Sequence, residues 1–168
     1  MAERKVIHKW VWVWDFEKEE RWLNEMAMSG WVLCGVGFCK YIFEKCDPAE
    51  YTVRLELRAG DSNYLDFINE IGAEYIGRVV AWIYLRKKTE DGPFDLYSDI
   101  DSRIDHLNRI GKMLGAIGFA NLLIGVANII GPNKAGFVNL ICATLLMYAI
   151  GRIHGKKESL ELDRMLRE

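Results

Sequence analysis

The sequence predicts an α+β domain followed by a hairpin of two transmembrane helices, and three observations support this fold class. Residues 5–86 alternate between strand-like and helix-like patterns of apolar side chains. Two long runs without a charged residue follow, at 113–130 and 135–151. Charge divides the chain at the same place, because residues 1–109 hold 15 Lys and Arg against 20 Asp and Glu, whereas residues 110–168 hold 7 against 4. The two parts therefore belong in different surroundings.

The α+β domain begins with a predicted strand over residues 5–14 and a helix that ends at Gly30. Large aromatic residues alternate along the strand: Trp10, Trp12 and Trp14. Asp15 is placed to cap the helix, whose apolar residues recur at three- and four-residue steps. The abrupt change from alternation to a helical period therefore predicts a strand–helix junction.

The rest of the domain continues as strand, strand, helix and strand. Residues 31–44 form a predicted strand that a bulge or tight hairpin interrupts near Gly35 and Gly37. Residues 51–58 alternate cleanly, a helix closes at Gly72, and a last strand, bent or doubled, spans about 75–86. The order β-α-β-β-α-β predicts a ferredoxin-like domain over residues 1–90, with two helices on one face of an antiparallel sheet.

The tryptophan row has two interpretations. Large aromatic side chains usually belong to the core, so we expect Trp12 to be buried. If the row lies on the open sheet face instead, it is an exposed aromatic surface on which a guanidinium can stack. The candidate ligand- or partner-binding residues on that face are Trp10, Trp12, Trp14, Arg54, Glu56 and Trp82.

A helical neck is predicted over residues 91–111 and a transmembrane hairpin over 112–152. Gly92 and Pro93 stop the last strand, and Ser98 or Asp99 can cap the neck helix. The spans, about 112–130 and 135–151, each reach roughly 25–27 Å at ~1.5 Å per residue, close to the ~30 Å hydrocarbon core. A buried hairpin in a soluble protein is the alternative interpretation.

The positions of Lys and Arg predict the orientation of the hairpin. They gather before the first span and after the second, whereas Lys134 alone lies in the turn. We therefore expect both termini in the cytoplasm, with residues 153–168 as a short tail helix at the membrane surface. A cleavable signal peptide is not expected, because residues 1–10 lack an apolar core.

Small and amide-bearing residues recur along the spans and predict close helix packing, within the hairpin or between copies in a homo-oligomer. These residues are Gly111, Gly115, Gly118, Asn121, Gly125, Asn128 and Asn139. The spans hold no ionisable side chain, which argues against a pore or an ion path.

Catalysis, metal binding and nucleic-acid binding are not expected. The three histidines are scattered, and the chain has no nucleophile motif, P-loop or zinc-protease motif. We therefore expect no cofactor and no metal. The acidic balance of residues 1–109 opposes contact with phosphates, and the four cysteines show no ligand spacing, as in a reducing compartment.

Two stretches carry a resemblance to a known family. They are DFEKEERWLNEMAMSGW (15–31) with YTVRLELR (51–58), and DGPFDLYSDIDSRIDHLNRI (91–110). Together they resemble bacterial membrane proteins of the domain of unknown function 2812 (DUF2812), over most of residues 5–110. Members typically carry this domain before transmembrane helices and are often encoded beside PadR-type regulators. The resemblance implies regulation or stress response and transfers no catalytic residue.

The function predicted from these observations is a non-enzymatic, membrane-anchored cytoplasmic module for sensing or protein interaction. Its expected partners are the lipid bilayer, further copies of the chain and a membrane protein. The alternative is a small accessory subunit of a transport or envelope-stress membrane complex. The sequence specifies neither the ligand nor the signal.

Overall fold

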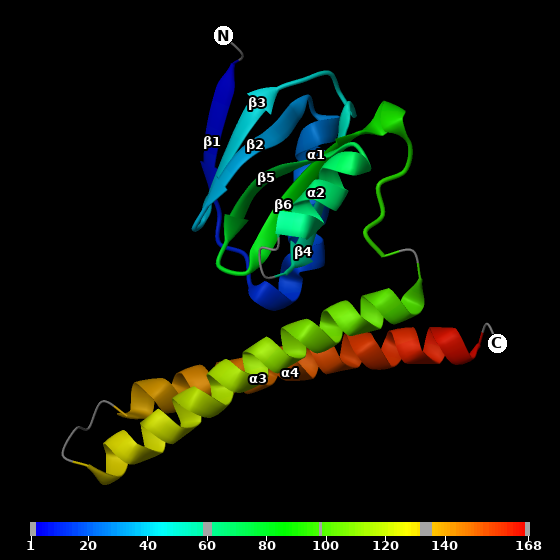
Figure 1. Cartoon of the computed structure of the whole chain (residues 1–168). Coiled ribbons are helices and arrows are strands. Elements are labelled where there is room, and N and C mark those ends of the chain that lie inside the picture. Colours follow the sequence, from blue (N-terminus) through cyan, green and yellow to red (C-terminus); the bar gives the residue numbers. More distant parts are fainter. Residues whose placement is uncertain (1–2, 59–61, 98, 132–135, 167–168) are drawn as a thin grey trace. The chain divides into compact units, whose positions relative to one another are not determined.

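The structure is a computed structural model that divides into two compact units, an α+β domain that ends at Leu96 and a helical hairpin that begins at Tyr97 (Figure 1). It describes residues 3–58, 62–97, 99–131 and 136–166. The predicted class, an α+β domain before two long apolar helices, is confirmed. The boundary between the units lies a few residues later than the expected end of the domain at residue 90.

The α+β domain consists of two β-α-β-β halves, each with a three-stranded antiparallel sheet. The first half comprises β1 (Arg4–His8), α1 (Phe16–Met28), β2 (Trp31–Gly37) and β3 (Lys40–Lys45), with a 3-10 helix at Val13–Asp15. The second comprises β4 (Tyr51–Leu57), α2 (Ser62–Glu70), β5 (Ala73–Val79) and β6 (Trp82–Lys88), followed by a 3-10 helix at Thr89–Asp91. The strand orders are β1-β3-β2 and β4-β6-β5.

From the ends of α1 and α2 onward, the two halves repeat the same structure at an offset of 42 residues. Gly30 and Gly72 follow the two helices with positive φ angles, +83° and +77°, which glycine adopts without steric cost (72 − 30 = 42). A register shift in β2 ends at Gly35, and the matching shift in β5 ends at Gly77 (77 − 35 = 42). The domain is therefore a tandem duplication of one supersecondary unit.

This architecture corrects the ferredoxin-like topology expected from the sequence. A ferredoxin-like domain has one sheet built from a single β-α-β-β-α-β series, whereas six strands here form two sheets. The segments 31–44 and 75–86 are two hairpins, which agrees with the tight-hairpin alternative for the first and the doubled strand for the second. The strand β4, at 51–57, lies at a sheet edge and pairs only with β6.

Two hydrophobic cores stabilise the domain, and β6 contributes to both because its successive side chains point to opposite faces. The core beside α1 joins residues of both halves: Leu23, Val32, Leu33, Tyr41, Phe43, Val53, Leu55 and Tyr84. The core beside α2 comprises Ile68, Ala73, Ile83, Leu85 and Phe94. The helices therefore pack against different surfaces, in contrast to the single helical layer that was expected.

Helix α1 also covers the free edge of β4 with polar side chains. The Asn24 amide accepts a hydrogen bond from the Val53 N–H at 2.9 Å and donates one to the Val53 carbonyl at 3.0 Å. The Glu20 carboxylate accepts from the Leu55 N–H at 3.0 Å. Exposed strand edges invite pairing with other chains, and these contacts occupy that edge.

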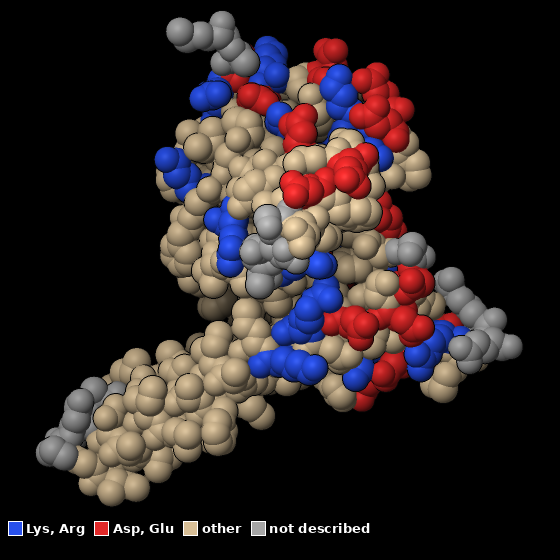
Figure 2. Space-filling model, in the orientation of Figure 1, with Lys and Arg blue, Asp and Glu red and all other residues tan. Residues whose placement is uncertain are grey.

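The hairpin consists of α3 (Ile100–Ile130) and α4 (Gly136–Met165), both long and apolar enough to cross a membrane. Figure 2 shows that charged side chains occupy only the half of the hairpin that contains its two ends, whereas the other half is free of them on the face in view. Large apolar side chains of that half, such as Phe119, Ile124 and Leu145, are exposed. A surface of this kind suits lipid tails.

The neck and the tail are continuous with the spans. Asp99 caps α3 by accepting a hydrogen bond from the Ser102 N–H at 2.6 Å, so the neck and the first span form one helix. The expected separate tail helix is instead the last part of α4. An ion pair of 2.8 Å between Arg164 and Asp101 joins the two ends. The predicted turn at 132–134 lies outside the described residues.

Candidate functional site

Exposed apolar side chains gather at one end of the α+β domain. Trp10 is 58% exposed, Trp12 45% and Phe38 72%. The Trp10 ring lies edge-on to both others, with centroids 5.4 Å from Trp12 and 5.9 Å from Phe38. Trp12 in turn stacks on the buried Trp14 at 4.8 Å, so the exposed rings rest on a fixed base.

The chain geometry explains why this row is not the face of a strand. Strand β1 ends at His8, and the Lys9 N–H still donates to the Cys39 carbonyl at 3.2 Å. Beyond it the chain leaves the sheet and turns through the 3-10 helix, which directs Trp14 inward. The expectation that Trp12 belongs to the core is therefore wrong, although it holds for Trp14.

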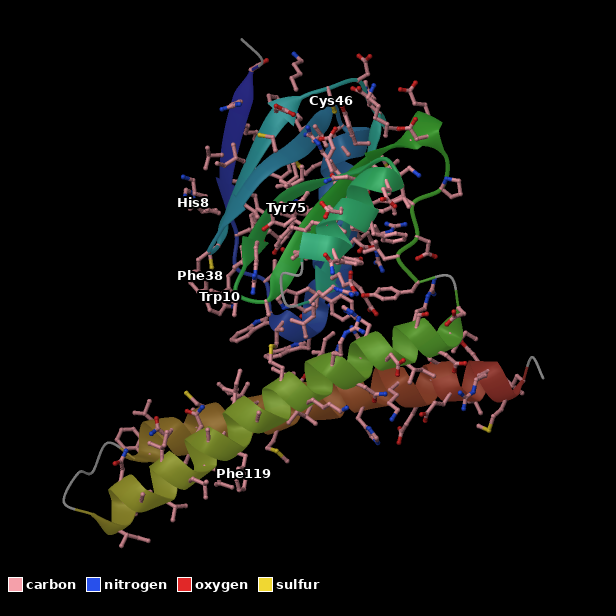
Figure 3. All side chains as sticks on the ribbon, in the orientation of Figure 1. His8, Trp10, Phe38, Cys46, Tyr75 and Phe119 are labelled. Atoms are coloured by element: carbon pink, nitrogen blue, oxygen red, sulfur yellow. The ribbon has the colours of Figure 1, made fainter. Side chains whose placement is uncertain are left out.

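Another exposed apolar side chain, Val80, lies in the turn between β5 and β6 and is 78% exposed. Phe38 lies in the turn between β2 and β3. Val80 is the counterpart of Phe38 in the repeat and adopts a left-handed φ of +56°, unusual for a β-branched residue. Figure 1 shows both hairpin turns at the same end of the domain, and Figure 3 shows Phe38 and Trp10 together there. We call Trp10, Trp12, Phe38 and Val80 the apolar tip.

The other predicted site residues lie elsewhere in the domain. Arg54 donates to Glu20 at 3.2 Å, and the buried Glu56 accepts a hydrogen bond from Tyr64 on α2 at 2.5 Å. Trp82 packs on Phe16 at 5.2 Å between centroids. The sheet face that would have joined the tryptophans to Arg54 and Glu56 therefore does not exist.

A buried carboxylate, not anticipated from the sequence, joins α1 to both sheets. Glu19 is buried, and its Oε1 accepts hydrogen bonds from the hydroxyls of Tyr41 and Tyr84, each at 2.7 Å. Tyr41 lies on β3 and Tyr84 on β6. Glu19 stands three residues after Phe16 and four before Leu23, on the apolar stripe of α1, and this position was the available signal.

Charge and burial shape the titration of this cluster. Burial, with the neighbouring Glu19 carboxylate second, raises the pKa of Tyr41 and of Tyr84 well above the usual range. Both hydroxyls therefore remain donors at physiological pH. Burial also lowers the pKa of Lys9, against the attraction of Glu19, and the Lys9 ammonium lies 3.9 Å from the centroid of the Trp22 ring.

The hairpin uses part of the predicted stripe of small residues. A Cβ on Gly118 would lie 3.4 Å from Leu146, and one on Gly125 would lie 2.7 Å from Leu140, so these glycines face α4. A Cβ on Gly111 or Gly115 would meet nothing within 4 Å. Three small residues of α4 also lie in the contact and were missed: Gly136, Ala143 and Ala149.

The asparagines of the predicted stripe are not joined by hydrogen bonds across the described part of the hairpin. Asn121 donates to the carbonyl of Ile117 in its own helix at 2.9 Å. Within the described part of α3 and α4, no hydrogen bond joins Asn128 to Asn139. Whether Asn128 and Asn139 meet a second copy of the chain stays a prediction.

The described residues contain no group of three or more His, Cys, Asp or Glu side chains that could hold a metal ion. The four cysteines are free thiols, and burial raises the pKa of Cys34 and Cys46. A thiol with a raised pKa is a weak nucleophile at neutral pH. The apolar tip presents exposed aromatic rings, and Glu19 accepts two buried hydrogen bonds.

Comparison with known families matches residues 15–119 to a family model described as a protein of unknown function, DUF2812. The chain belongs to the DUF2812 family. The match includes α1, all the strands except β1, α2 and the first two-thirds of α3, so the family unit joins the domain to the start of the first apolar helix. No curated protein and no solved structure matches the chain.

Proposed function

We propose that this DUF2812 protein is a membrane-anchored module for sensing or interaction in a bacterial regulatory or stress-response system, and that it acts by binding and not by catalysis. The observation that carries the proposal is the apolar tip. Most other large aromatic side chains of the domain are at least partly buried, whereas Trp10, Trp12 and Phe38 lie together in solvent. Clusters of this kind mark interaction surfaces.

The hairpin supplies the anchor in this proposal. Its two apolar helices suit a bilayer, and basic residues flank both at the end that carries the domain: Arg103, Arg109, Lys112, Arg152, Lys156 and Lys157. Because cytoplasmic flanks carry the excess of Lys and Arg, the orientation favoured is one with both termini, and hence the domain, in the cytoplasm of the cell membrane. Gly111 and Gly115, where an added Cβ would meet nothing within 4 Å, would serve contacts between copies in a homo-oligomer.

Photo-crosslinking in cells tests the proposal. A benzophenone amino acid at position 38 of the full chain should form crosslinked adducts with whatever binds the apolar tip. The same probe at Phe67 should form few adducts, although Phe67 is equally apolar and is 51% exposed on α2. Equal yields at the two positions would refute a binding role for the apolar tip.

Purification in mild detergent then separates this function from the alternative. Recovery of the chain with only its own copies supports a sensing module. Stoichiometric recovery of a transporter or envelope-stress complex, lost with Phe38→Asp and kept with Phe67→Asp, would instead show an accessory subunit.

A further inference from the structure

We propose that the apolar tip docks on the surface of the membrane that anchors the chain, with its side chains at the level of the lipid headgroups and with anionic lipid preferred. This inference rests on the proposed membrane anchor and deepens it by naming the partner of the exposed tip. The occupant is lipid, and a protein partner at the same surface is an outcome that the experiment below would reveal.

The residue types of the tip suit a bilayer interface. Tryptophan is enriched at membrane–water interfaces because its ring is largely apolar and its indole N–H is polar. Trp10 and Trp12 are such residues, and Phe38 and Val80 project from two hairpin turns. Side chains on turns can enter the headgroup region while the paired strands behind them stay in water.

The charge around the tip differs from that of the rest of the domain. The segments 8–13, 36–40 and 77–82 contain Lys9, Lys40 and Arg78 and no acidic residue, although residues 1–109 hold more acidic than basic side chains. On the face shown in Figure 2, the acidic side chains of the domain gather away from this end. A basic apolar surface on an acidic domain is complementary to anionic lipid.

The positions of the two turns make a single docking surface from parts distant in the sequence. The Cγ1 of Val36 lies 2.9 Å from where a Cβ on Gly77 would be, so β2 and β5 lie side by side near their final residues. Strands β2 and β5 run toward the same end in Figure 1, where each enters its turn. The Arg78 Nε donates to the Val80 carbonyl at 2.8 Å, which holds a guanidinium beside the second turn.

Tethering reduces the affinity that such a surface needs. A chain already anchored by two spans presents its domain to the bilayer at a high effective concentration, so an insertion too weak to recruit a free protein is sufficient. The charged start of α3, from Asp101 to Lys112, is roughly 18 Å long at 1.5 Å per residue, which limits the length of the tether between the domain and the first span.

Tryptophan fluorescence of the full chain in lipid vesicles tests the proposal directly. All six tryptophans lie between residues 10 and 82, so the hairpin contributes no signal. The probe is lipid brominated on the acyl chain near the headgroup, in vesicles of phosphatidylcholine with about a third phosphatidylglycerol, compared with the same vesicles without bromine. Since two of the six tryptophans belong to the tip, we expect loss of about a quarter to a third of the emission.

The matched variants are Phe38→Asp and Phe67→Asp, which place the same charge at two exposed phenylalanines. We expect Phe38→Asp to lower the quenching at least twofold and Phe67→Asp to leave it unchanged. Val80→Asp should act like Phe38→Asp, and it is compatible with folding because Asp tolerates the left-handed φ of that position better than Val. Omitting phosphatidylglycerol should also lower the quenching at least twofold.

Flotation of the vesicles separates the two levels of the proposal. A chain that fails to float with lipid would overturn the membrane anchor itself. A chain that floats but shows no quenching by brominated lipid, or equal quenching in Phe38→Asp and Phe67→Asp, would overturn lipid docking and leave the anchor intact. Tryptophans that become protected only when another protein is added would assign the tip to that protein.

Discussion

The buried Glu19 cluster gives the sharpest prediction about stability. Replacing Glu19 by Ala leaves the hydroxyls of Tyr41 and Tyr84 buried without their acceptor. Each unsatisfied hydroxyl costs ~1–3 kcal/mol, so the domain should lose about 3–5 kcal/mol of unfolding free energy. Glu19→Gln keeps an acceptor oxygen and loses only the charge, so we expect it to cost about 1–2 kcal/mol.

The cluster acts as one unit, so the costs should not add. Changing both tyrosines to Phe leaves a buried carboxylate without donors, which costs ~3–5 kcal/mol by itself. The triple variant, with Glu19→Ala and both tyrosines changed to Phe, leaves no polar group unpaired. Its loss of unfolding free energy should therefore be at least ~2 kcal/mol smaller than the sum of the losses for Glu19→Ala and for the double tyrosine variant.

Urea unfolding of the full chain in mild detergent measures these values, since all the tryptophans that report unfolding belong to the α+β domain. Glu25→Ala is the control, because Glu25 is exposed on the same helix. Strict additivity, or a cost for Glu19→Ala within ~1 kcal/mol of the control, would refute the reading of Glu19 as the residue that joins the two sheets.

The raised pKa values of Tyr41 and Tyr84 favour the protonated hydroxyls in the folded state, so their contribution to stability is complete below pH ~10 and is lost above it. Above that pH the free energy of unfolding should fall by ~1.4 kcal/mol per pH unit for each tyrosine. Urea titrations at alkaline pH should show that Tyr84→Phe removes the share of this fall that belongs to one tyrosine. In the hairpin, Gly125→Leu should disrupt packing of α3 on α4 and Gly115→Leu should not, as measured by disulfide crosslinking between introduced cysteines; equal crosslinking would mean that Gly125 does not face α4. Cysteine labelling in intact cells should leave both termini unlabelled by impermeant reagents, and an outward terminus would contradict the proposed orientation.

The sequence predicted the class and the helices well because local signals determine them. Helix ends at Gly30 and Gly72 follow from glycine in the left-handed region, and the two uncharged runs predict the two long apolar helices. The topology was not predicted because the turns carry no Gly-Asn or Asp-Gly signal, so the hairpin at 31–44 and the doubled strand at 75–86 stayed open alternatives and the expected order kept one strand in each segment. In the turn at Phe38 the next residue, Cys39, has a positive φ angle, and in the other turn Val80 itself has one. Neither residue is the glycine that would have signalled a turn.

The candidate site was only partly predictable. The tryptophan row was recognised, but its surroundings depend on where β1 ends, which pairing with β3 decides and no local pattern shows. A signal for the duplication was present, since Gly30 and Gly35 recur as Gly72 and Gly77. Recognising that repeat would have predicted six strands and placed the two turns in equivalent positions.

The duplication has a consequence for how the protein could assemble. Each half is only about 42 residues long, too short to bury a core alone, so Leu23 and Phe43 of one half pack with Val53 and Tyr84 of the other. The halves meet within one chain because residues 46–50 allow β4 to fold back after β3. Shortening that connection would let the second half of one molecule complete the first half of another, which yields a domain-swapped dimer with four membrane helices in place of an unfolded chain.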